Sequence, residues 1–204
     1  GGRSVDRILS NWEPLTILAA RLREKFEMPG MSADVVRGFR DKQIMKERVK
    51  AAGLRVPRSV RVKSEKEIWA AAEEIGYPLV LKPIAGAGSA DTHKVTSKRE
   101  MEAILPTMRH VQECSCEEFI EGEEFTYDTV SIDGKPAYEN IASYLPKPIE
   151  ARNVEWISPV IITVRDMYAP KFKGGIELGH NVLKALQMGT GFTHMEWFLT
   201  PKGE

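Results

Sequence analysis

A lysine followed by a loop of small residues is the first part of the sequence that could do chemistry. Lys82 ends a short apolar run, Leu79–Leu81, that is typical of a buried strand, and the chain then continues as Pro-Ile-Ala-Gly-Ala-Gly-Ser-Ala. A charged amine at the end of a buried strand is costly unless it meets an anion. In the loop, Gly86, Gly88 and Ser89 allow backbone N–H groups to approach phosphate oxygens closely. The pattern favours a phosphate site, although taken alone it fits an ordinary hairpin loop equally well.

An acidic segment, Glu117–Glu124, is the second such feature. Five of its eight residues are glutamate, with Phe119 and Ile120 between them. Taken alone, such a run is more often a solvated face. Here, however, the strand predicted over 114–120 breaks at Gly122, and a strand break leaves backbone N–H and C=O groups that a purine edge can use. An acid just beyond the break could accept hydrogen bonds from ribose hydroxyls, so the segment is a candidate nucleoside site.

The elements that must position these residues form an α+β pattern. Helices are predicted over residues 14–26, 32–40, 42–52, 64–75, 97–105 and 174–188. Strands are predicted over residues 57–62, 78–82, 93–96, 114–120, 125–132, 136–144 and 193–200. Ser32 and Asp41 are suited to cap the helices that follow them, and Ser64 and Ser97 each open a capping box. Asp133-Gly134 predicts a tight hairpin turn.

Composition and cysteine usage argue against several classes of protein. The 29 basic and 29 acidic residues give a formal net charge of +0, whereas nucleic-acid binders usually carry a basic excess. The sequence contains no run of 18 apolar residues, so no membrane span is predicted. Cys114 and Cys116 have no second pair, so we expect small buried side chains rather than a metal site. This usage suits a reducing cytoplasm.

In order and spacing these motifs resemble the ATP-grasp superfamily, most closely the branch with biotin carboxylase, carbamoyl-phosphate synthetase and the purine-pathway enzymes. The resemblance runs from Asp41-Lys42 through Gly76–Pro83, the glycine-rich loop and Glu117–Glu124 to the end of the chain. It implies an α+β fold in which two subdomains clasp ATP. Residues 41–113 would form the small lid subdomain, and residues 114–204 an incomplete C-terminal subdomain. Residues 1–40 would be the tail of a preceding Rossmann-like domain.

The resemblance also implies which residues contact the phosphates of ATP. Lys42 would reach them from the start of a helix, and Lys82 would contact the α- and β-phosphate oxygens. Gly86, Gly88 and Ser89 would lie in a loop that closes over them. Beyond Ser89 the sequence departs from the family, because it lacks the Arg-Gly or Val-Gly often found there.

Further residues are implied to bind the nucleoside. Glu117 would accept a hydrogen bond from the adenine amino group. Glu118, Phe119 and Ile120 would form the segment whose backbone contacts adenine, with Phe119 lining the cleft. Glu124 would bind the ribose. No residue of the sequence is assigned a catalytic role.

Glu196 matches the first acid with which the family binds Mg²⁺ or Mn²⁺, although a plain surface glutamate is the alternative. The second acid and its partners should follow on a strand after the turn at 201–203, where the sequence stops. We therefore expect a fragment that binds ATP poorly and turns over nothing alone. A genuine C-terminus in a loop is the other interpretation.

The resemblance implies a ligase that uses ATP to activate a carboxylate as an acyl phosphate, which a nucleophile such as an amine or thiol then attacks. ATP and a small-molecule carboxylate are the expected partners, without nucleic acid or membrane, and association into a homo-oligomer stays open. Two other interpretations remain. One is a non-catalytic ATP-binding sensor or scaffold, and the other is an α+β interaction domain with no nucleotide.

Overall fold

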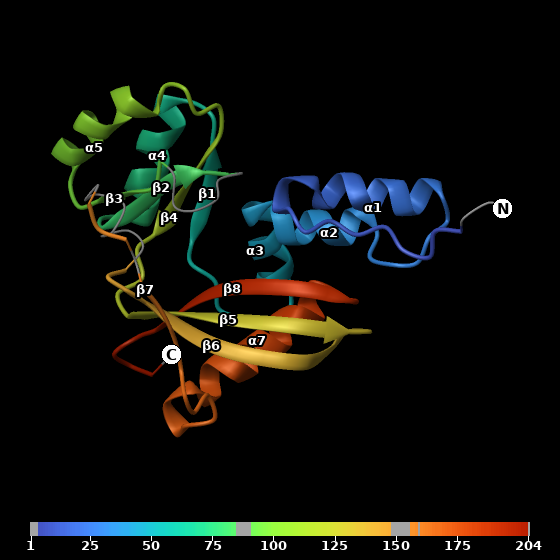
Figure 1. Cartoon of the computed structure of the whole chain (residues 1–204). Coiled ribbons are helices and arrows are strands. Elements are labelled where there is room, and N and C mark those ends of the chain that lie inside the picture. The colour runs from blue at the N-terminus through green and yellow to red at the C-terminus, as the bar shows by residue number, and fades with distance from the viewer. Residues whose placement is uncertain (1–3, 85–90, 148–155, 159, 204) are drawn as a thin grey trace.

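A computed structural model of the chain describes residues 4–84, 91–147, 156–158 and 160–203. These residues form a helical N-terminal part and two four-stranded antiparallel sheets, each with helices on one face (Figure 1). The predicted α+β class is confirmed. Gly86, Gly88 and Ser89 lie outside the described residues.

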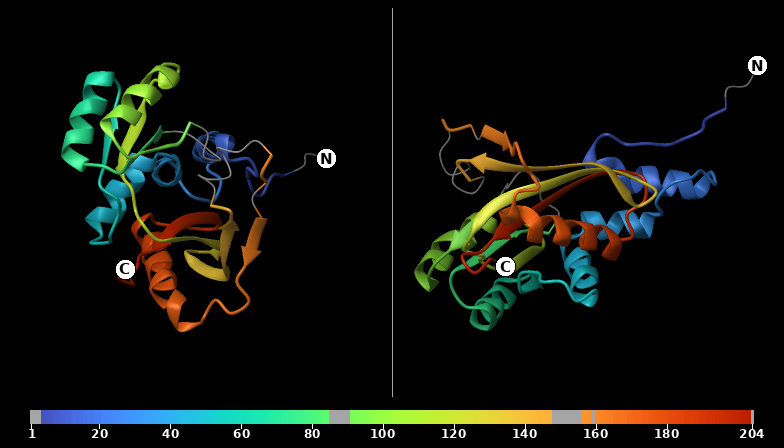
Figure 2. Two further views of the ribbon diagram at one scale, coloured as in Figure 1. Left: turned by 90° about the vertical axis from the view of Figure 1, so that its left-hand side faces the viewer. Right: turned by 90° about the horizontal axis from the view of Figure 1, so that it is seen from below.

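The N-terminal part consists of short helices that pack in chain order. They are η1 (Glu13–Leu15), α1 (Thr16–Lys25), α2 (Ala33–Arg40) and α3 (Lys42–Ala51). A small core of Ala20, Ala33 and Val36 lies between α1 and α2. The Ser32 side chain accepts a hydrogen bond from the Val35 backbone N–H at 3.2 Å, so the predicted cap of α2 is confirmed. Figure 2 shows the N-terminal end of the chain extending away from the two sheets, while Met31 and Phe39 of this part pack against the core of the second sheet.

The first sheet has the strand order β1-β4-β2-β3. Its strands are β1 (Ser59–Val62), β2 (Leu79–Pro83), β3 (His93–Val95) and β4 (Cys114–Glu118). One face packs against α4 (Glu65–Ile75) and α5 (Lys98–Ile104), which is followed by η2 (Leu105–Met108). Leu79, Leu81 and Cys116 are fully buried on that face. Because side chains alternate along a strand, Lys82 and Glu117 point to the opposite face.

Strand β4 belongs to this first sheet. It pairs with β1 and β2, so that Cys116 lies opposite both Val60 and Leu81. The subdomain boundary expected after residue 113 would therefore divide the sheet, whereas the two sheets separate along the chain at residues 119–122. Cys114 and Cys116 are buried free thiols as predicted, and burial raises the pKa of Cys116 to about 12.

The second sheet has the strand order β7-β6-β5-β8. Its strands are β5 (Glu123–Ile132), β6 (Lys135–Leu145), β7 (Val160–Thr163) and β8 (Gly191–Leu199). Asp133 and Gly134 have φ values of 48° and 79°, so the predicted hairpin turn between β5 and β6 is confirmed. β7 was not predicted. It is four residues long and exposed throughout, so its sequence shows no alternation of buried and exposed positions.

Helix α7 (Lys173–Ala185), preceded by η3 (Pro170–Phe172), covers one face of the second sheet. Two glycines one helical turn apart allow it to approach closely. A Cβ on Gly175 would lie 2.4 Å from the Trp197 ring, and one on Gly179 would lie 2.4 Å from the Tyr127 ring. Both distances are far below van der Waals contact, so the aromatic side chains occupy the space that larger helix residues would need.

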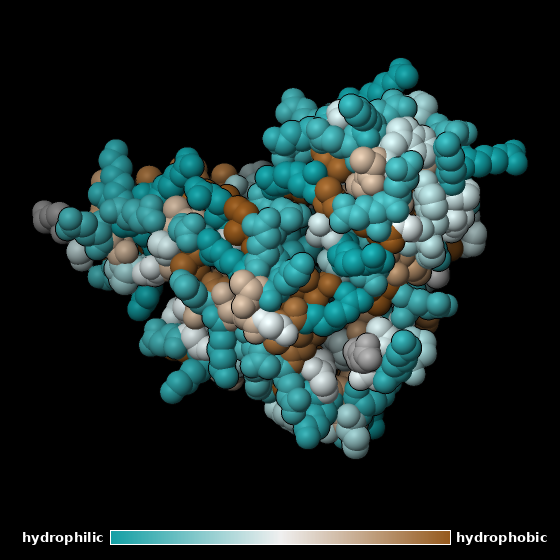
Figure 3. Space-filling model, turned by 180° about the vertical axis from the view of Figure 1, so that it is seen from behind, coloured by the Kyte–Doolittle hydropathy of each residue, from teal (hydrophilic) through white to brown (hydrophobic). Residues whose placement is uncertain are grey.

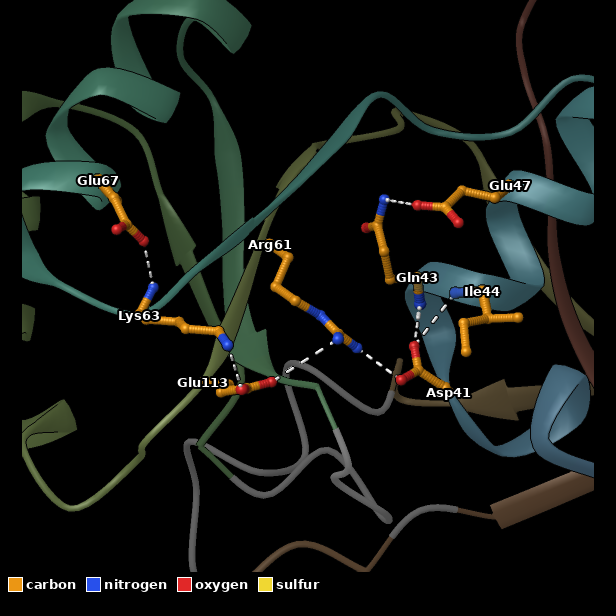
Figure 4. Close-up of polar contacts among 8 residues, drawn as sticks. All are labelled: Asp41, Gln43, Ile44, Glu47, Arg61, Lys63, Glu67 and Glu113. Carbon is orange, nitrogen blue, oxygen red and sulfur yellow. Dashed lines mark hydrogen bonds and ion pairs between the residues drawn. The ribbon is translucent and has the colours of Figure 1, made fainter.

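Asp41 joins the start of α3 to the first sheet (Figure 4). Its Oδ1 atom accepts hydrogen bonds from the backbone N–H groups of Gln43 and Ile44 at 2.9 and 3.1 Å, which confirms the predicted cap. Its Oδ2 atom accepts a hydrogen bond from Arg61 of β1 at 2.6 Å. Arg61 and Lys63 both lie near the Glu113 carboxylate, at 3.8 and 2.9 Å. This chain of ion pairs fixes α3 against the sheet.

The surface seen from behind is mainly hydrophilic, and hydrophobic side chains show mostly near its middle (Figure 3). Within the described ranges, no helix is long and apolar enough to cross a membrane.

We predict that Gly179→Ala lowers the free energy of unfolding by about 1–3 kcal/mol, the usual cost of overpacking a well-packed core. The added methyl group meets the Tyr127 ring, which is 1% exposed and cannot move away. Gly174→Ala is the matched control on the same helix, because nothing lies within 4 Å of its added Cβ. Alanine favours helices over glycine, so the control should be as stable as the wild type or more so. Urea unfolding measures both, and equal stabilities of the two variants would contradict the close packing.

A second prediction concerns the pH dependence of stability. Burial would raise the pKa of Asp41, but hydrogen bonds from Arg61 and the Ile44 N–H outweigh it and hold the pKa below its ordinary value. A carboxyl group with a lowered folded-state pKa stabilises the fold above its unfolded pKa of about 4, and this contribution is lost as the pH falls through the folded value.

Asp41→Asn should therefore destabilise the chain at pH 7 and have a smaller effect near pH 3. The amide oxygen can still cap the helix, so the loss at pH 7 reports mainly the pairing with Arg61. Asp34→Asn is the control, since its carboxylate is 71% exposed. Urea unfolding at both pH values measures the difference, and an unchanged loss at pH 3 would contradict the assignment.

Candidate functional site

The face of the first sheet opposite α4 and α5 is polar. The strand register places Arg61, Ser115 and Lys82 in one row across the sheet, and Glu117 and Lys94 in the next row. Helix α3 lies beside this face because Asp41 is bound to Arg61. The face therefore collects basic residues around the buried Glu117, and the Glu113 carboxylate also lies near Arg61.

Glu117 shares its carboxylate between two lysines. Its Oε2 atom lies 3.0 Å from Lys82 Nζ, and its Oε1 atom lies 2.5 Å from the Nζ of Lys46 on α3. Glu117 and Lys46 are only 4% and 7% exposed, so both charges are removed from water. A buried carboxylate requires such partners, because an unpaired charge in the interior is costly.

The electrostatics of this cluster favour an anion. Burial would raise the pKa of Glu117, but Lys82 and Lys46 outweigh it and lower the pKa. The pKa of Lys46 is lowered, first by burial. The pKa of Lys42 is also lowered, by burial and then by Lys82, against the opposing effects of Glu196 and Glu117. Two ammonium groups thus lie next to one carboxylate, and an incoming anion would offset the cost of keeping the lysines charged.

The second sheet presents an acidic face on the side away from α7. Glu124 and Asp128 of β5 lie on this face with Glu196 and His194 of β8, because the register pairs Asp128 with His194 and Thr126 with Glu196. The Asp128 carboxylate lies 2.5 Å from the His194 ring, and the hydrogen bond between them raises the pKa of His194.

The charge of Glu196, on the acidic face, opposes the lowering of the Lys42 pKa by burial and Lys82. Glu196 itself is exposed. Among the residues that the structure describes, no three His, Cys, Asp or Glu side chains are grouped so that they could hold a metal ion. Glu196 is thus a single candidate ligand, placed beside the lysines.

The predicted nucleoside residues divide into two groups. Phe119 lies on the polar face of the first sheet, with Lys94 Nζ 3.9 Å from its ring centroid, while Ile120 is half-buried in the segment that joins the two sheets. The Glu118 side chain instead turns toward Arg55, with a nitrogen–oxygen distance of 3.0 Å. The Glu118 backbone N–H donates to the carbonyl oxygen of Arg58 at 2.8 Å, so it is already engaged.

Glu124 lines an open groove at the end of the second sheet, with a volume of about 560 Å³. Tyr144, Lys147 and Arg165 line the same groove. Lys147 also donates a hydrogen bond to the Gly122 carbonyl oxygen at 2.9 Å, at the break between β4 and β5. The residue predicted to bind ribose therefore lies in a concave, partly basic site.

Lys46 is the site residue that sequence reasoning missed. It follows Lys42 by four positions, a spacing that places both side chains on one face of α3. That spacing was the available signal, but it also fits a solvated helix face. Only the contact with Glu117, far later in the chain, distinguishes the two interpretations.

A family model and several known proteins match this chain. Residues 39–138 match the model of the ATP-grasp domain. The L-arginine-specific L-amino acid ligase of Bacillus subtilis is 27% identical over 206 residues, covering 98% of this chain and 49% of that protein. The N-terminal section of the carbamoyl phosphate synthase large chain from Aquifex aeolicus is 22% identical over 182 residues, covering 86% of this chain and 32% of that protein.

Among solved structures, the L-amino acid ligase from Bacillus licheniformis superposes with a TM-score of 0.76 at 22% identity, covering 97% of this chain and 46% of that one. The chain thus spans about half the length of the amino acid ligases it matches. The similarity extends over both sheets and the helices before them, in the order of the chain. The chain thus contains an ATP-grasp domain over residues 39–138, and its two-sheet fold is similar to that of the L-amino acid ligase.

Proposed function

We propose that this chain supplies the ATP-binding part of a ligase that activates a carboxylate as an acyl phosphate and transfers the acyl group to an amine or similar nucleophile. The observation that carries the proposal is the buried Glu117 carboxylate held between Lys46 and Lys82, on the polar face of the first sheet. The likeness to amino acid ligases supports an amine as the nucleophile. The two free cysteines suit a reducing cytoplasm.

Lys42 and Lys82 would bind the phosphates, because Lys82 is the more exposed lysine of the Glu117 cluster and its charge acts on Lys42. Phe119 and Ile120 would contact adenine from the segment that joins the sheets, and Glu124 would bind the ribose. The lid subdomain would then extend to residue 118, since β4 is part of its sheet. Residues 1–40 would belong to the domain that precedes it.

Glu196 would contribute to a site for Mg²⁺ or Mn²⁺, which prefer carboxylate and phosphate oxygens. Its position near Lys42 suits an ion shared with the phosphates. Such an ion, when bound, supplies positive charge to the phosphate oxygens. The described residues provide one of its ligands and do not complete the set.

The reaction needs no nucleophile from the described part of the chain. The substrate carboxylate oxygen attacks the γ-phosphorus, the bond from phosphorus to the ADP oxygen breaks, and ADP leaves. An amine then attacks the acyl carbon, loses a proton and displaces inorganic phosphate. Lys42 and Lys82 neutralise charge that shifts during the first step. Cys114 and Cys116 take no part, because burial raises both of their pKa values.

We predict that Lys82→Ala weakens ATP binding by about 1–3 kcal/mol, the size of a charge-assisted contact. Glu124→Ala should weaken ATP and adenosine alike, whereas Lys82→Ala should leave adenosine unaffected. Lys50→Ala is the control, because Lys50 is an exposed lysine on α3. Titration calorimetry measures the affinities. Equal ATP affinity of the wild type and Lys82→Ala would remove the phosphate role of this residue.

A further prediction concerns turnover by the protein that contains this chain. ADP formation should be slow with ATP and Mg²⁺ alone and should rise sharply with the correct carboxylate, because the attacking oxygen comes from the substrate. Hydroxylamine should trap the acyl phosphate as a hydroxamate. The measurement is ADP release over a panel of amino acids and other carboxylates. Tight ATP binding without acceleration by any carboxylate would favour a sensor or scaffold, and a full rate without acceptor would indicate an ATPase.

A further inference from the structure

The carboxylate of Glu117 holds together three separate elements. Lys46 comes from α3, Lys82 from β2 and Glu117 from β4, and each carboxylate oxygen lies next to one lysine, at 2.5 and 3.0 Å. The three residues are far apart in sequence, so the cluster exists only in the folded chain. Both oxygens of Glu117 are therefore committed to cations from this chain.

The two lysines differ in burial. The Lys46 side chain is 9% exposed and that of Glu117 is 5% exposed, whereas the Lys82 side chain is 23% exposed. Lys46 is enclosed with the carboxylate and cannot reach outward to a ligand. Lys82 extends from the cluster toward the surface. The buried pair Lys46–Glu117 is thus held in place, and Lys82 is the member of the cluster that an incoming anion can contact.

The charge balance explains why both lysines are needed. With Lys82 alone, the carboxylate would be neutralised by the same ammonium group that must bind a phosphate. With Lys46 also present, two positive charges face one negative charge, and one positive charge remains. Because the surroundings are shielded from water, this balance acts strongly on the geometry of Lys82.

We propose that Lys46 and Glu117 are positioning residues for Lys82: Lys46 neutralises Glu117, and Glu117 orients Lys82 so that its ammonium group remains available to a polyphosphate. The proposal rests on the proposed nucleotide function. It assigns Glu117 a role different from the contact with the adenine amino group that the resemblance implies. Changes at Glu117 should then weaken the binding of a triphosphate whose base lacks this amino group as strongly as they weaken the binding of ATP.

The test compares Lys46→Met, Glu117→Gln, the double variant and the control Lys50→Met. Binding of ATP and of inosine triphosphate, whose base carries a carbonyl in place of the amino group, is measured by calorimetry. Lys46→Met should weaken both by about tenfold, as the loss of about one charge-assisted contact would. Glu117→Gln should weaken both by the same factor. The double variant should bind about as well as either single variant, because Lys46 acts only through the Glu117 carboxylate.

Two results would overturn the proposal. If Glu117→Gln weakens ATP and leaves inosine triphosphate unchanged, Glu117 contacts the adenine amino group instead. If the two single losses multiply in the double variant, Lys46 does not act through Glu117. Urea unfolding of each variant shows that the compared proteins are folded, and Lys50→Met should match the wild type in every measurement.

A second measurement needs no nucleotide. The titration of Lys46 is followed by NMR of chains labelled at the lysine side chains. Glu117 raises the pKa of Lys46 against the effects of burial, Lys82 and Lys42, so Glu117→Gln should move the titration to lower pH. An unchanged titration would overturn the cluster itself. If the wild-type chain binds no triphosphate but Glu117→Gln still moves the Lys46 titration, the nucleotide function is overturned and the cluster stands. The two failures are therefore distinguishable.

Discussion

The buried carboxylate of Glu117 between Lys46 and Lys82 is the interaction on which the arrangement of the site depends. Removing two or three charges from water costs several kcal/mol per ion, and their mutual attraction returns this only when the geometry is good. Apolar residues of similar size would often stabilise the same position as well. A cluster of this kind is therefore weak evidence for stability and better evidence for a site that needs charge.

The cluster depends on where α3 lies. Lys46 reaches Glu117 only because the start of the helix is fixed to β1 through Asp41 and Arg61. Asp41 caps α3 with one carboxylate oxygen and binds Arg61 with the other, so one side chain fixes both where the helix begins and what it lies against. The phosphate-binding role proposed for Lys42, the next residue, thus depends on a capping interaction.

Local features were predictable from the sequence, and distant contacts were not. The caps at Ser32 and Asp41 and the turn at Asp133-Gly134 involve residues two to three positions apart, so their chemistry is visible in the chain itself. β4 was assigned to the wrong side of the subdomain boundary, because its pairing with β1 and β2 spans long stretches of sequence. Lys46 was missed for the same reason. The roles of the remaining candidates, among them Glu124 and Glu196, stay predictions.

The two links between α3 and the first sheet belong to different electrostatic regimes. Arg61 and Asp41 are 32% and 22% exposed, whereas the side chains of Lys46 and Glu117 are 9% and 5% exposed. Dissolved ions screen charges that water reaches and have little effect on enclosed ones. Raising the ionic strength will therefore loosen the capped end of α3 before it disturbs the buried pair one turn further along. The helix will then remain attached to the first sheet through the ion pair of Lys46 with Glu117 alone.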